Sequence, residues 1–404
     1  MMRDKLATFV DENLPLLDPV IAHERTDYGW RGLTAQGEVL EVKQANGHAI
    51  EVPVEIVVAR NGIPIGRRKV SNERPLSIDN YLVHFNRVVG YYRANDLAQA
   101  MLESDLTLAI APTLRAKFNR AMVLLAAGQW QEGLAEYWQC EQEPPFMRPQ
   151  VQAALGEGMR PWLGEDLKGK SILLMHAHGF GDSIMMLRYV PVLRARGAEV
   201  YLKVPEELER LAAQQDALIV GQLIDVDYFC PLLHLLHFLK VIPDGVIGRG
   251  SYLEVEQTDV LRWHENVISE KKKIGVAWSI GKPSLGDYPR EIELEPLVDV
   301  LRGGGEDVDI HSVQTQGRDE AVKLGVKTHY FEDFADCAAL MMAMDEIVSV
   351  DTAALHLAGA IGHPRVFGLL SHWASWRWVA PWYENIEFRR QPAEGDWLGA
   401  LLQI

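Results

Sequence analysis

The chain has 404 residues, enough for two or three domains with sizeable cores, and its 48% hydrophobic and 24% charged residues are typical of a globular protein. The formal net charge of −16 argues against nonspecific binding to nucleic acid or to an anionic membrane. Three widely spaced cysteines, Cys140, Cys230 and Cys337, favour a reducing compartment and argue against a zinc knuckle. The pattern contains neither a signal-peptide core nor a membrane span, so we expect a cytoplasmic protein.

Residues 1–78 predict a small β-rich N-terminal region. The stretch from 39 to 70 is rich in β-branched residues, and Asn46–Gly47 and Asn61–Gly62 are turn signals. Part of the stretch from 51 to 58 alternates between apolar and polar residues, as a half-buried strand does.

Residues 79–145 are predicted to be helical and internally repetitive. The run Phe85–Arg87 recurs as Phe118–Arg120, close to the ~34-residue period of helix-turn-helix repeats of the tetratricopeptide type. Two units are fewer than the ~3 that such arrays need to be stable alone, so we expect the repeats to pack against another part of the chain. The repeats either present a surface to an acceptor or partner, or act as a structural brace.

Residues 146–404 predict an α/β fold with two Rossmann-like domains, 146–269 and 270–404. In the first, the apolar strand Ser171–His176 runs into a glycine turn and then into a helical pattern. In the second, the strand Ile347–Val350 ends where a helix begins. Further predicted strands cover 199–204, 224–229, 274–278, 308–313 and 366–370, and predicted helices cover 184–194, 206–213, 294–301 and 334–344.

The end of the strand in the second domain suits an anionic ligand. Ligands of open α/β sheets gather at the carboxyl ends of strands, and a helix N-terminus offers free N–H groups to a phosphate. His356 lies one turn into the helix, on the same face as Thr352. Alternatively, Asp351 caps the helix and His356 is a satisfied histidine of the core.

The glycine turn of the first domain is the other candidate. Gly179 and Gly181 permit a tight turn and a close approach of the backbone to a ligand, and Asp182 would face the crevice at the start of the helix. Alternatively, Asp182 caps the helix and the glycines serve packing only. The pattern lacks the third glycine of a dinucleotide-binding fingerprint.

Several motifs occur in a characteristic order along roughly residues 80–395. They are Pro161–Lys170, Gly179–Asp182, Arg188–Pro191, Gly275–Ser279, Asp351–Thr352 with His356–Gly359, and Trp376–Trp378 with Pro381–Tyr383. Together they resemble the tetratricopeptide-repeat glycosyltransferases related to the bacterial heptosyltransferases, of the glycosyltransferase family 9 type. The resemblance implies a GT-B fold, a nucleotide-activated sugar donor and no metal requirement.

The resemblance also implies roles for the two candidate sites. Asp182 would be the general base, because the family's catalytic carboxylate occupies this Gly-x-Gly-Asp position. Thr352 and the N–H groups of its helix would bind the diphosphate of the donor, with Asp351, Gly179 and Gly181 in the same nucleotide-sugar site. His356 would add a hydrogen bond or the charge of an imidazolium.

Two further segments complete the predicted donor site. Trp278 is followed by a Gly/Pro-rich loop that carries two cations, Lys282 and Arg290, and such a loop fits a lid that closes over the donor. Alternatively, each of the two cations is a solvent-exposed charge. Gln314 ends a strand where the family holds a polar residue close to the nucleoside, and otherwise it caps the loop 315–318.

Aromatic and histidine residues near these motifs have two readings. An aromatic cluster could wall the sugar or acceptor pocket, or could pack into the core; it consists of Trp373, Trp376, Trp378, Trp382 and Tyr383. His176 and His178 flank the glycine turn with no third ligand in view, so we expect no metal and no cofactor besides the donor substrate.

We therefore expect a metal-independent, inverting GT-B glycosyltransferase that acts on a saccharide or protein acceptor, which the helical repeats could recruit. One alternative is a non-catalytic repeat protein whose degenerate GT-B halves bind a nucleotide-sugar without turnover. Another is a sugar-nucleotide epimerase. The chain departs from many relatives at His176–His178, where they carry an acidic or amide residue, and at Glu291, and these changes bear on the donor's identity.

Overall fold

The computed structural model describes residues 78–144, 146–280, 290–305, 307–373 and 375–402, together with five short strands between residues 20 and 64. The chain forms two compact units. The first comprises the described residues up to Met147 and the segment Ser375–Arg377, and the second comprises the others. Within the described part of the chain, no helix is both long enough and apolar enough to cross a bilayer.

The strands of the first unit lie in the predicted β-rich region. β1 (Val20–Thr26), β2 (Gly29–Thr34) and β3 (Val39–Lys43) form a three-stranded antiparallel sheet, and β4 (Ala59–Arg60) pairs with β5 (Ile63–Pro64). The rest of that region up to residue 77 lies outside the described residues, so its organisation stays a prediction.

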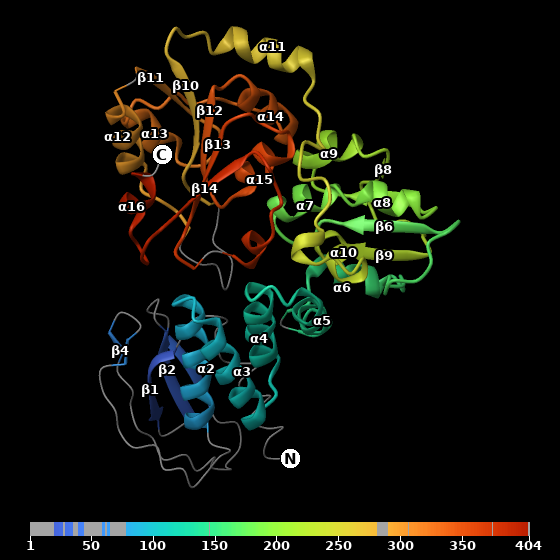
Figure 1. Cartoon of the computed structure of the whole chain (residues 1–404). Helices are drawn as coiled ribbons and strands as arrows, with labels where there is room; N and C mark the ends of the chain where they lie inside the picture. Colours follow the sequence, from blue (N-terminus) through green and yellow to red (C-terminus); the bar gives the residue numbers. More distant parts are fainter. Residues whose placement is uncertain are drawn as a thin grey trace. The chain divides into compact units, whose positions relative to one another are not determined.

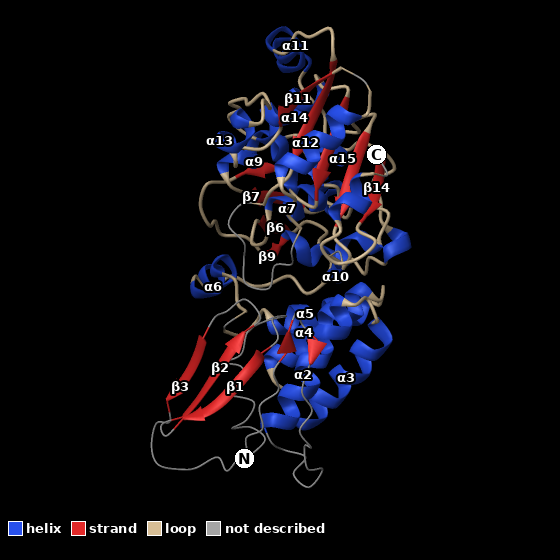
Figure 2. Ribbon diagram, turned by 90° about the vertical axis from the view of Figure 1, so that its left-hand side faces the viewer, coloured by secondary structure: helices blue, strands red, loops and turns tan. Residues whose placement is uncertain are grey.

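Four consecutive helices complete the first unit: α2 (Ile78–Arg93), α3 (Leu97–Ile110), α4 (Leu114–Ala126) and α5 (Trp130–Cys140). The side chain of Asp96 accepts a hydrogen bond from the N–H of Gln99, and that of Thr113 accepts one from Ala116, so α3 and α4 each begin at a capping residue. α2 packs on α3, α3 on α4 and α4 on α5 (Figure 2). Each helical hairpin covers one predicted repeat, and their tetratricopeptide type stays a prediction.

The first half of the second unit is built on a four-stranded parallel sheet in the order β8-β7-β6-β9 (Figure 1). Its strands are β6 (Ser171–Met175), β7 (Glu199–Lys203), β8 (Leu218–Ile219) and β9 (Tyr228–Pro231). Its helices are α6 (Pro149–Gly156), α7 (Phe180–Leu187), α8 (Val190–Ala195), α9 (Glu206–Ala213) and α10 (Leu235–Phe238), with short 3-10 turns η1 (Leu232–His234) and η2 (Pro243–Gly245).

The helix predicted after the glycine turn differs in the structure. The predicted helix over 184–194 begins earlier, at Phe180, and is broken after Leu187. Pro191 lies in the first turn of the next helix, α8. Because proline has no backbone N–H, it cannot continue the hydrogen bonding of α7, so the chain turns before α8 begins.

The second half is built on a five-stranded parallel sheet in the order β11-β10-β12-β13-β14. Its strands are β10 (Lys272–Ala277), β11 (Val308–Ser312), β12 (Glu346–Val350), β13 (Val366–Leu370) and β14 (Ile386–Arg390). Its helices are α11 (Gln257–Asn266), α12 (Leu294–Gly303), α13 (Arg318–Lys323), α14 (Phe334–Met342), α15 (Ala353–Ala360) and α16 (Trp397–Leu401), with the 3-10 turn η3 (Trp376–Val379), which crosses the boundary of the two units.

Helices cover both faces of the five-stranded sheet. α12 packs on α16, and α14 packs on α15, and the two pairs lie on opposite sides of the strands (Figure 1). Side chains of β10, β12 and β13 form a buried core with Leu294 and Leu297 of α12. β13 is apolar along its length because parallel strands are buried on both faces, whereas β10 and β12 begin with charged residues.

Both sheets reverse their strand order at the motifs that the sequence singles out. In the first sheet the order reverses beside β6, because β7 and β8 lie on one side of it and β9 on the other. In the second sheet the order reverses between β10 and β12. Ligands of open α/β sheets bind at the carboxyl ends of strands at such switch points. The glycine turn after β6, Trp278 after β10 and Asp351 after β12 all occupy these positions.

Candidate active site

The glycine turn after β6 is held by hydrogen bonds within its own loop and helix. Oδ2 of Asp182 accepts the N–H of Gly179 at 3.2 Å, so the carboxylate caps α7. The side chain of Ser183 bonds to Nδ1 of His176 at 2.9 Å. Burial, and next the neighbouring His178, lower the pKa of His176. Asp182 itself is only 8% exposed and stands at the positive end of the helix.

Gly181 is where the two halves of the second unit meet. A Cβ at this position would lie 2.6 Å from Cδ2 of His356 and 3.5 Å from the Cα of Ala353, so only glycine lets the first turns of α7 and α15 pack this closely. The glycine predicted to approach a ligand therefore approaches another helix. The contact brings the turn that holds Asp182 beside the start of the helix that carries Thr352 and His356.

The start of α15 carries polar side chains. Thr352 is the N-cap residue, and among the described residues its hydroxyl caps no N–H of α15 but lies 3.3 Å from the hydroxyl of Ser349. Asp351 is buried, and its Oδ2 lies 3.9 Å from Nη1 of Arg290. Of the two cations predicted on the preceding loop, Arg290 thus reaches this helix, and Lys282 lies outside the described residues.

His356 is buried, in agreement with the alternative interpretation that it is a histidine of the core. It is 3% exposed, and its ring stacks on Trp378 with centroids 4.7 Å apart and planes at 11°. Nδ1 lies 3.0 Å from the hydroxyl of Tyr383. The edge with Cδ2 and Nε2 faces Gly181. The same ring therefore belongs to the core and borders the place where the two helices meet.

Gln314 connects the ends of β10 and β11 by hydrogen bonds. Its Oε1 accepts the N–H groups of Trp278 at 2.8 Å and of Ser279 at 3.1 Å. Its Nε2 donates to Oγ of Ser279 at 2.8 Å and to the carbonyl of Gln316 at 3.0 Å. Both polar atoms of the amide are thus engaged within the chain, and a contact of Gln314 with a nucleoside stays a prediction.

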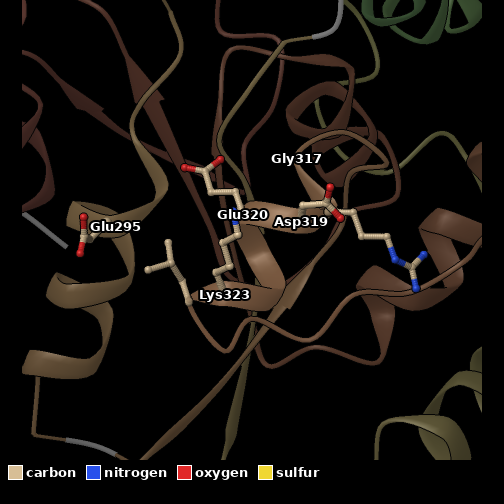
Figure 3. A pocket seen from close by; sticks show the side chains of 7 residues that line it. Glu295, Gly317, Asp319, Glu320 and Lys323 are labelled. Carbon is tan, nitrogen blue, oxygen red and sulfur yellow. The ribbon is translucent and has the colours of Figure 1, made fainter.

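A pocket of about 630 Å³ lies beside these strand ends, on residues that sequence reasoning did not single out. It is lined by Glu295, Gly317, Arg318, Asp319, Glu320, Lys323 and Leu324. Figure 3 shows Glu320 and Lys323 on one helix and Glu295 on another. Oε2 of Glu320 accepts the indole N–H of Trp278 at 3.3 Å, which ties the pocket wall to the end of β10. The carboxylates of the pocket can accept hydrogen bonds from sugar hydroxyls, and Arg318 and Lys323 add positive charge.

Arg188, just after α7, is a buried cation that links the two halves. It is 4% exposed, and its Nη1 donates to the carbonyls of Ile247 at 3.1 Å and Trp382 at 2.9 Å. Its guanidinium lies 4.4 Å from the ring centroid of Tyr252 and 4.9 Å from that of Tyr383. The resemblance includes Arg188, but no sequence signal indicates that it is buried.

A second link between the halves is exposed. Nη1 of Arg210, on α9, donates to Oδ1 of Asp333 at 3.2 Å, and its Nη2 donates to Oδ2 of Asp259 at 2.5 Å. The side chain of Arg210 is about half exposed, so water and salt screen these pairs.

The predicted aromatic cluster separates into different environments. Trp376 belongs to the first unit, where it contacts the ring of Trp130 edge to face at 5.5 Å. Trp373 and Trp382 are buried in the second unit, and Trp378 stacks on His356. The packing alternative therefore describes most of this cluster.

Comparison with known proteins gives distant similarities. No family model matches the chain. Protein FlbA of Caulobacter vibrioides is 24% identical over 327 residues, 70% of this chain and 52% of that protein, so the chain spans about half the length of this curated relative. A glycosyl transferase of family 9 from Veillonella parvula is 11% identical, with a TM-score of 0.40 over 57% of this chain and 88% of that one. The ADP-heptose lps heptosyltransferase II of E. coli is 13% identical, with a TM-score of 0.40 over 58% and 99%.

Proposed function

We propose that the second unit moves a sugar from a nucleotide-activated donor to an acceptor hydroxyl, with inversion and without a metal. The observation that supports this most is the contact of α7 with α15 at Gly181. There the turn with the carboxylate of Asp182 adjoins the helix N-terminus with Thr352 and His356, at the carboxyl ends of two parallel sheets. A proton-accepting carboxylate and donors for a leaving diphosphate are the two things this reaction needs.

The start of α15 supplies positive potential for the diphosphate. A helix N-terminus carries roughly half a positive charge, and Arg290 adds a full charge close to Asp351. Asp351 offsets part of that charge but also holds Arg290 near the helix. In this proposal the hydroxyl of Thr352 donates to a phosphate oxygen, since it caps no N–H of its own helix among the described residues.

The pocket beside Glu320 would hold the nucleoside of the donor. It lies at the carboxyl ends of β10 and β11, next to the switch point of the second sheet. The carboxylate of Glu320 can accept hydrogen bonds from ribose hydroxyls while it holds the indole of Trp278. We expect Glu320→Ala to weaken binding of a nucleoside diphosphate and Glu295→Ala to do so less, because Glu295 has no link to a strand end in the described structure.

The variant Asp182→Asn tests the base. The amide oxygen of asparagine can still accept the N–H of Gly179, so the cap and the fold should persist. We expect turnover to fall by roughly 10²–10⁴-fold with donor affinity unchanged, the usual scale for loss of a general base. A screen of nucleotide-sugars by thermal shift identifies the donor first, because a ligand of the native state raises the unfolding temperature. Near-normal turnover in Asp182→Asn removes Asp182 from the mechanism.

The variant Thr352→Val tests the diphosphate site. Loss of one hydrogen bond to a charged group should weaken nucleoside diphosphate binding by about 1–3 kcal/mol in calorimetry. Thr258→Val, at an exposed position of α11, is the matched control and should bind normally.

Activity should also survive a chelator. Loss in EDTA with recovery in magnesium or manganese contradicts the metal-free proposal.

A protein that binds the donor without turnover is the second candidate. The observation in its favour is the cap that Asp182 makes on Gly179, a structural role that needs no chemistry. This candidate predicts donor binding in calorimetry, no transfer to any acceptor, and unchanged donor affinity in Asp182→Asn.

A further inference from the structure

We propose that His176 is a second catalytic residue of the glycine turn, whose Nε2 takes the proton of the acceptor hydroxyl while Asp182 offsets the charge of the imidazolium that forms. Ser183 is the positioning residue that holds the ring. The inference rests on the proposed function and refines one step of it, because the proton goes to a neighbour of Asp182 instead of to Asp182 itself.

His176 is held at the carboxyl end of β6, beside which the strand order of the first sheet reverses. Its backbone N–H donates to the carbonyl of Lys203 at 2.9 Å, so it continues the pairing of β6 with β7. The centroid of its ring lies 5.4 Å from that of Phe180, and the ring of Phe180 lies 5.1 Å from that of Phe334, the first residue of α14 in the second half. His176 therefore stands where the two halves of the second unit meet, which is where an acceptor would face the donor.

The two ring nitrogens of His176 have different surroundings. Nδ1 lies 2.9 Å from Oγ of Ser183, a buried residue of α7. The histidine is half-buried, and within the described part of the chain its Nε2 makes no hydrogen bond and is not fully buried. A serine hydroxyl can accept from Nδ1–H as well as donate to Nδ1. The proposal requires the first arrangement, which leaves the lone pair of Nε2 for the hydroxyl of an acceptor.

The charged groups around His176 suit a ring that is neutral at rest and charged during the reaction. Burial, and next His178 on the same loop, lower the pKa of His176, whereas Asp182 of α7 and Glu207 of α9 raise it in part. The ammonium of Lys203, on β7, donates to a backbone carbonyl at 3.0 Å. Near neutral pH the ring is therefore unprotonated and can accept a proton. The negative charge of Asp182 then stabilises the imidazolium.

Transfer with His176 as the proton acceptor breaks two bonds and forms two. The O–H bond of the acceptor breaks and its proton goes to Nε2, while an electron pair of the oxygen forms the new bond to the anomeric carbon. The bond from that carbon to the diphosphate breaks, and its electron pair leaves with the diphosphate. The imidazolium then gives its proton to water. Asp182, whose Oδ2 accepts the N–H of Gly179, supplies a fixed negative charge throughout.

Nitrogen NMR of the full chain, labelled at histidine, tests the pair without any ligand. We expect neutral His176 to carry its proton on Nδ1 and to titrate below about 6.5, the usual pKa of histidine. Asp182→Asn should lower this pKa further, because the removed charge stabilises the imidazolium. Asp216→Asn, at an exposed position after α9, is the matched control and should leave the pKa unchanged. A proton on Nε2 of the neutral ring, or an equal pKa in Asp182→Asn, overturns the proposal.

The pH dependence of turnover tests the step itself. The probes are the nucleotide-sugar found by thermal shift and, as acceptors, a set of monosaccharides and of peptides that contain serine or threonine. We expect kcat/KM to fall on the acid side, with its midpoint at the pKa that NMR gives for His176. His176→Asn should lower turnover by roughly 10²–10⁴-fold and abolish this fall, because the amide can keep the bond to Ser183 but cannot take a proton.

Ser183→Ala tests the positioning of the ring. We expect turnover to fall by roughly tenfold, the scale of one hydrogen bond, and the acid midpoint to move. Ser104→Ala, at a buried helical serine of α3, is the matched control and should leave both unchanged. If the acid midpoint persists in His176→Asn, Asp182 takes the proton itself, so the inference is wrong while the proposed function stands. Absence of both donor binding and transfer contradicts the proposed function, whereas the pairing of His176 with Asp182 is judged by NMR alone.

Discussion

Replacing Gly181 with alanine tests the contact on which the site is built. The added Cβ would lie 2.6 Å from Cδ2 of His356, and real Cβ atoms essentially never come within 3.0 Å of another heavy atom. The histidine ring cannot move aside easily, because Trp378 stacks on it and Tyr383 bonds to it. The first turns of α7 and α15 must therefore separate by several tenths of an ångström, and overpacking of this kind costs about 1–3 kcal/mol.

Gly303→Ala is the matched control for this experiment. A Cβ at Gly303, the last residue of α12, meets no atom within 4 Å, so alanine there should be neutral or should stabilise the helix by up to about 1 kcal/mol. The two variants are compared by urea unfolding, monitored by tryptophan fluorescence. Both replace a helical glycine with alanine, so most of the gain in helix propensity cancels in the difference between their free energies of unfolding. We expect Gly181→Ala to unfold at a lower urea midpoint than Gly303→Ala. Its free energy of unfolding should be lower by about 1–3 kcal/mol. Equal midpoints would refute the packing of α7 on α15.

Three further outcomes follow from buried polar groups and thiols. Asp336→Ala should lower the free energy of unfolding by about 1–3 kcal/mol, because Oδ1 of Asp336 accepts the buried indole N–H of Trp263 at 2.7 Å. A free energy of unfolding equal to that of the unaltered protein contradicts this bond. Burial, and next the stacked His329, lower the pKa of His311 to about 4, so the folded state binds fewer protons than the unfolded chain. The unfolding temperature should therefore fall as the pH drops from about 6.5 towards 4, and an NMR titration of His311 near pH 6.5 would show the assignment to be wrong. Cys230 and Cys337 are buried and their thiol pKa values are raised, so mass spectrometry should find them alkylated only after unfolding, and modification of the native protein contradicts their burial.

The central strands could be predicted from sequence for a physical reason. A parallel strand buried on both faces is a continuous apolar run, so the predicted strand 366–370 coincides with β13. The predicted strand 347–350 differs from β12 by one residue. The edge strand β14 mixes apolar and charged residues, and α11 has a largely polar sequence, so neither has a clear periodic signal. The strand predicted over 224–229 lies at 228–231, because Pro231 ends β9 and the residues before it form an irregular loop.

The candidate site could be predicted only in part. The motifs place Asp182 and Thr352 at the starts of helices that follow apolar strands, and in the structure Asp182 lies in the first turn of α7 and Thr352 is the N-cap of α15. That Gly181 touches His356 could not be predicted, because it depends on how two halves of the second unit pack. The bonds of Gln314 to Trp278 and Ser279 could not be predicted either, because only the folded sheet brings the ends of β10 and β11 together. The role of Asp182 as a base and of Lys282 as a donor contact stay predictions.

Arg188 limits how the two halves of the second unit can move. Its guanidinium donates to the carbonyl of Trp382 in one half from a position in the other, and loss of a hydrogen bond made by a charged group costs about 1.5–3 kcal/mol. Sliding or separation of the halves at this point is therefore strongly opposed. A rotation about Arg188 keeps its bonds, and the exposed pairs of Arg210 with Asp259 and Asp333 can break at less than about 1 kcal/mol each. We therefore expect any opening between α7 and α15 to occur as a rotation about Arg188 rather than as a separation of the two halves.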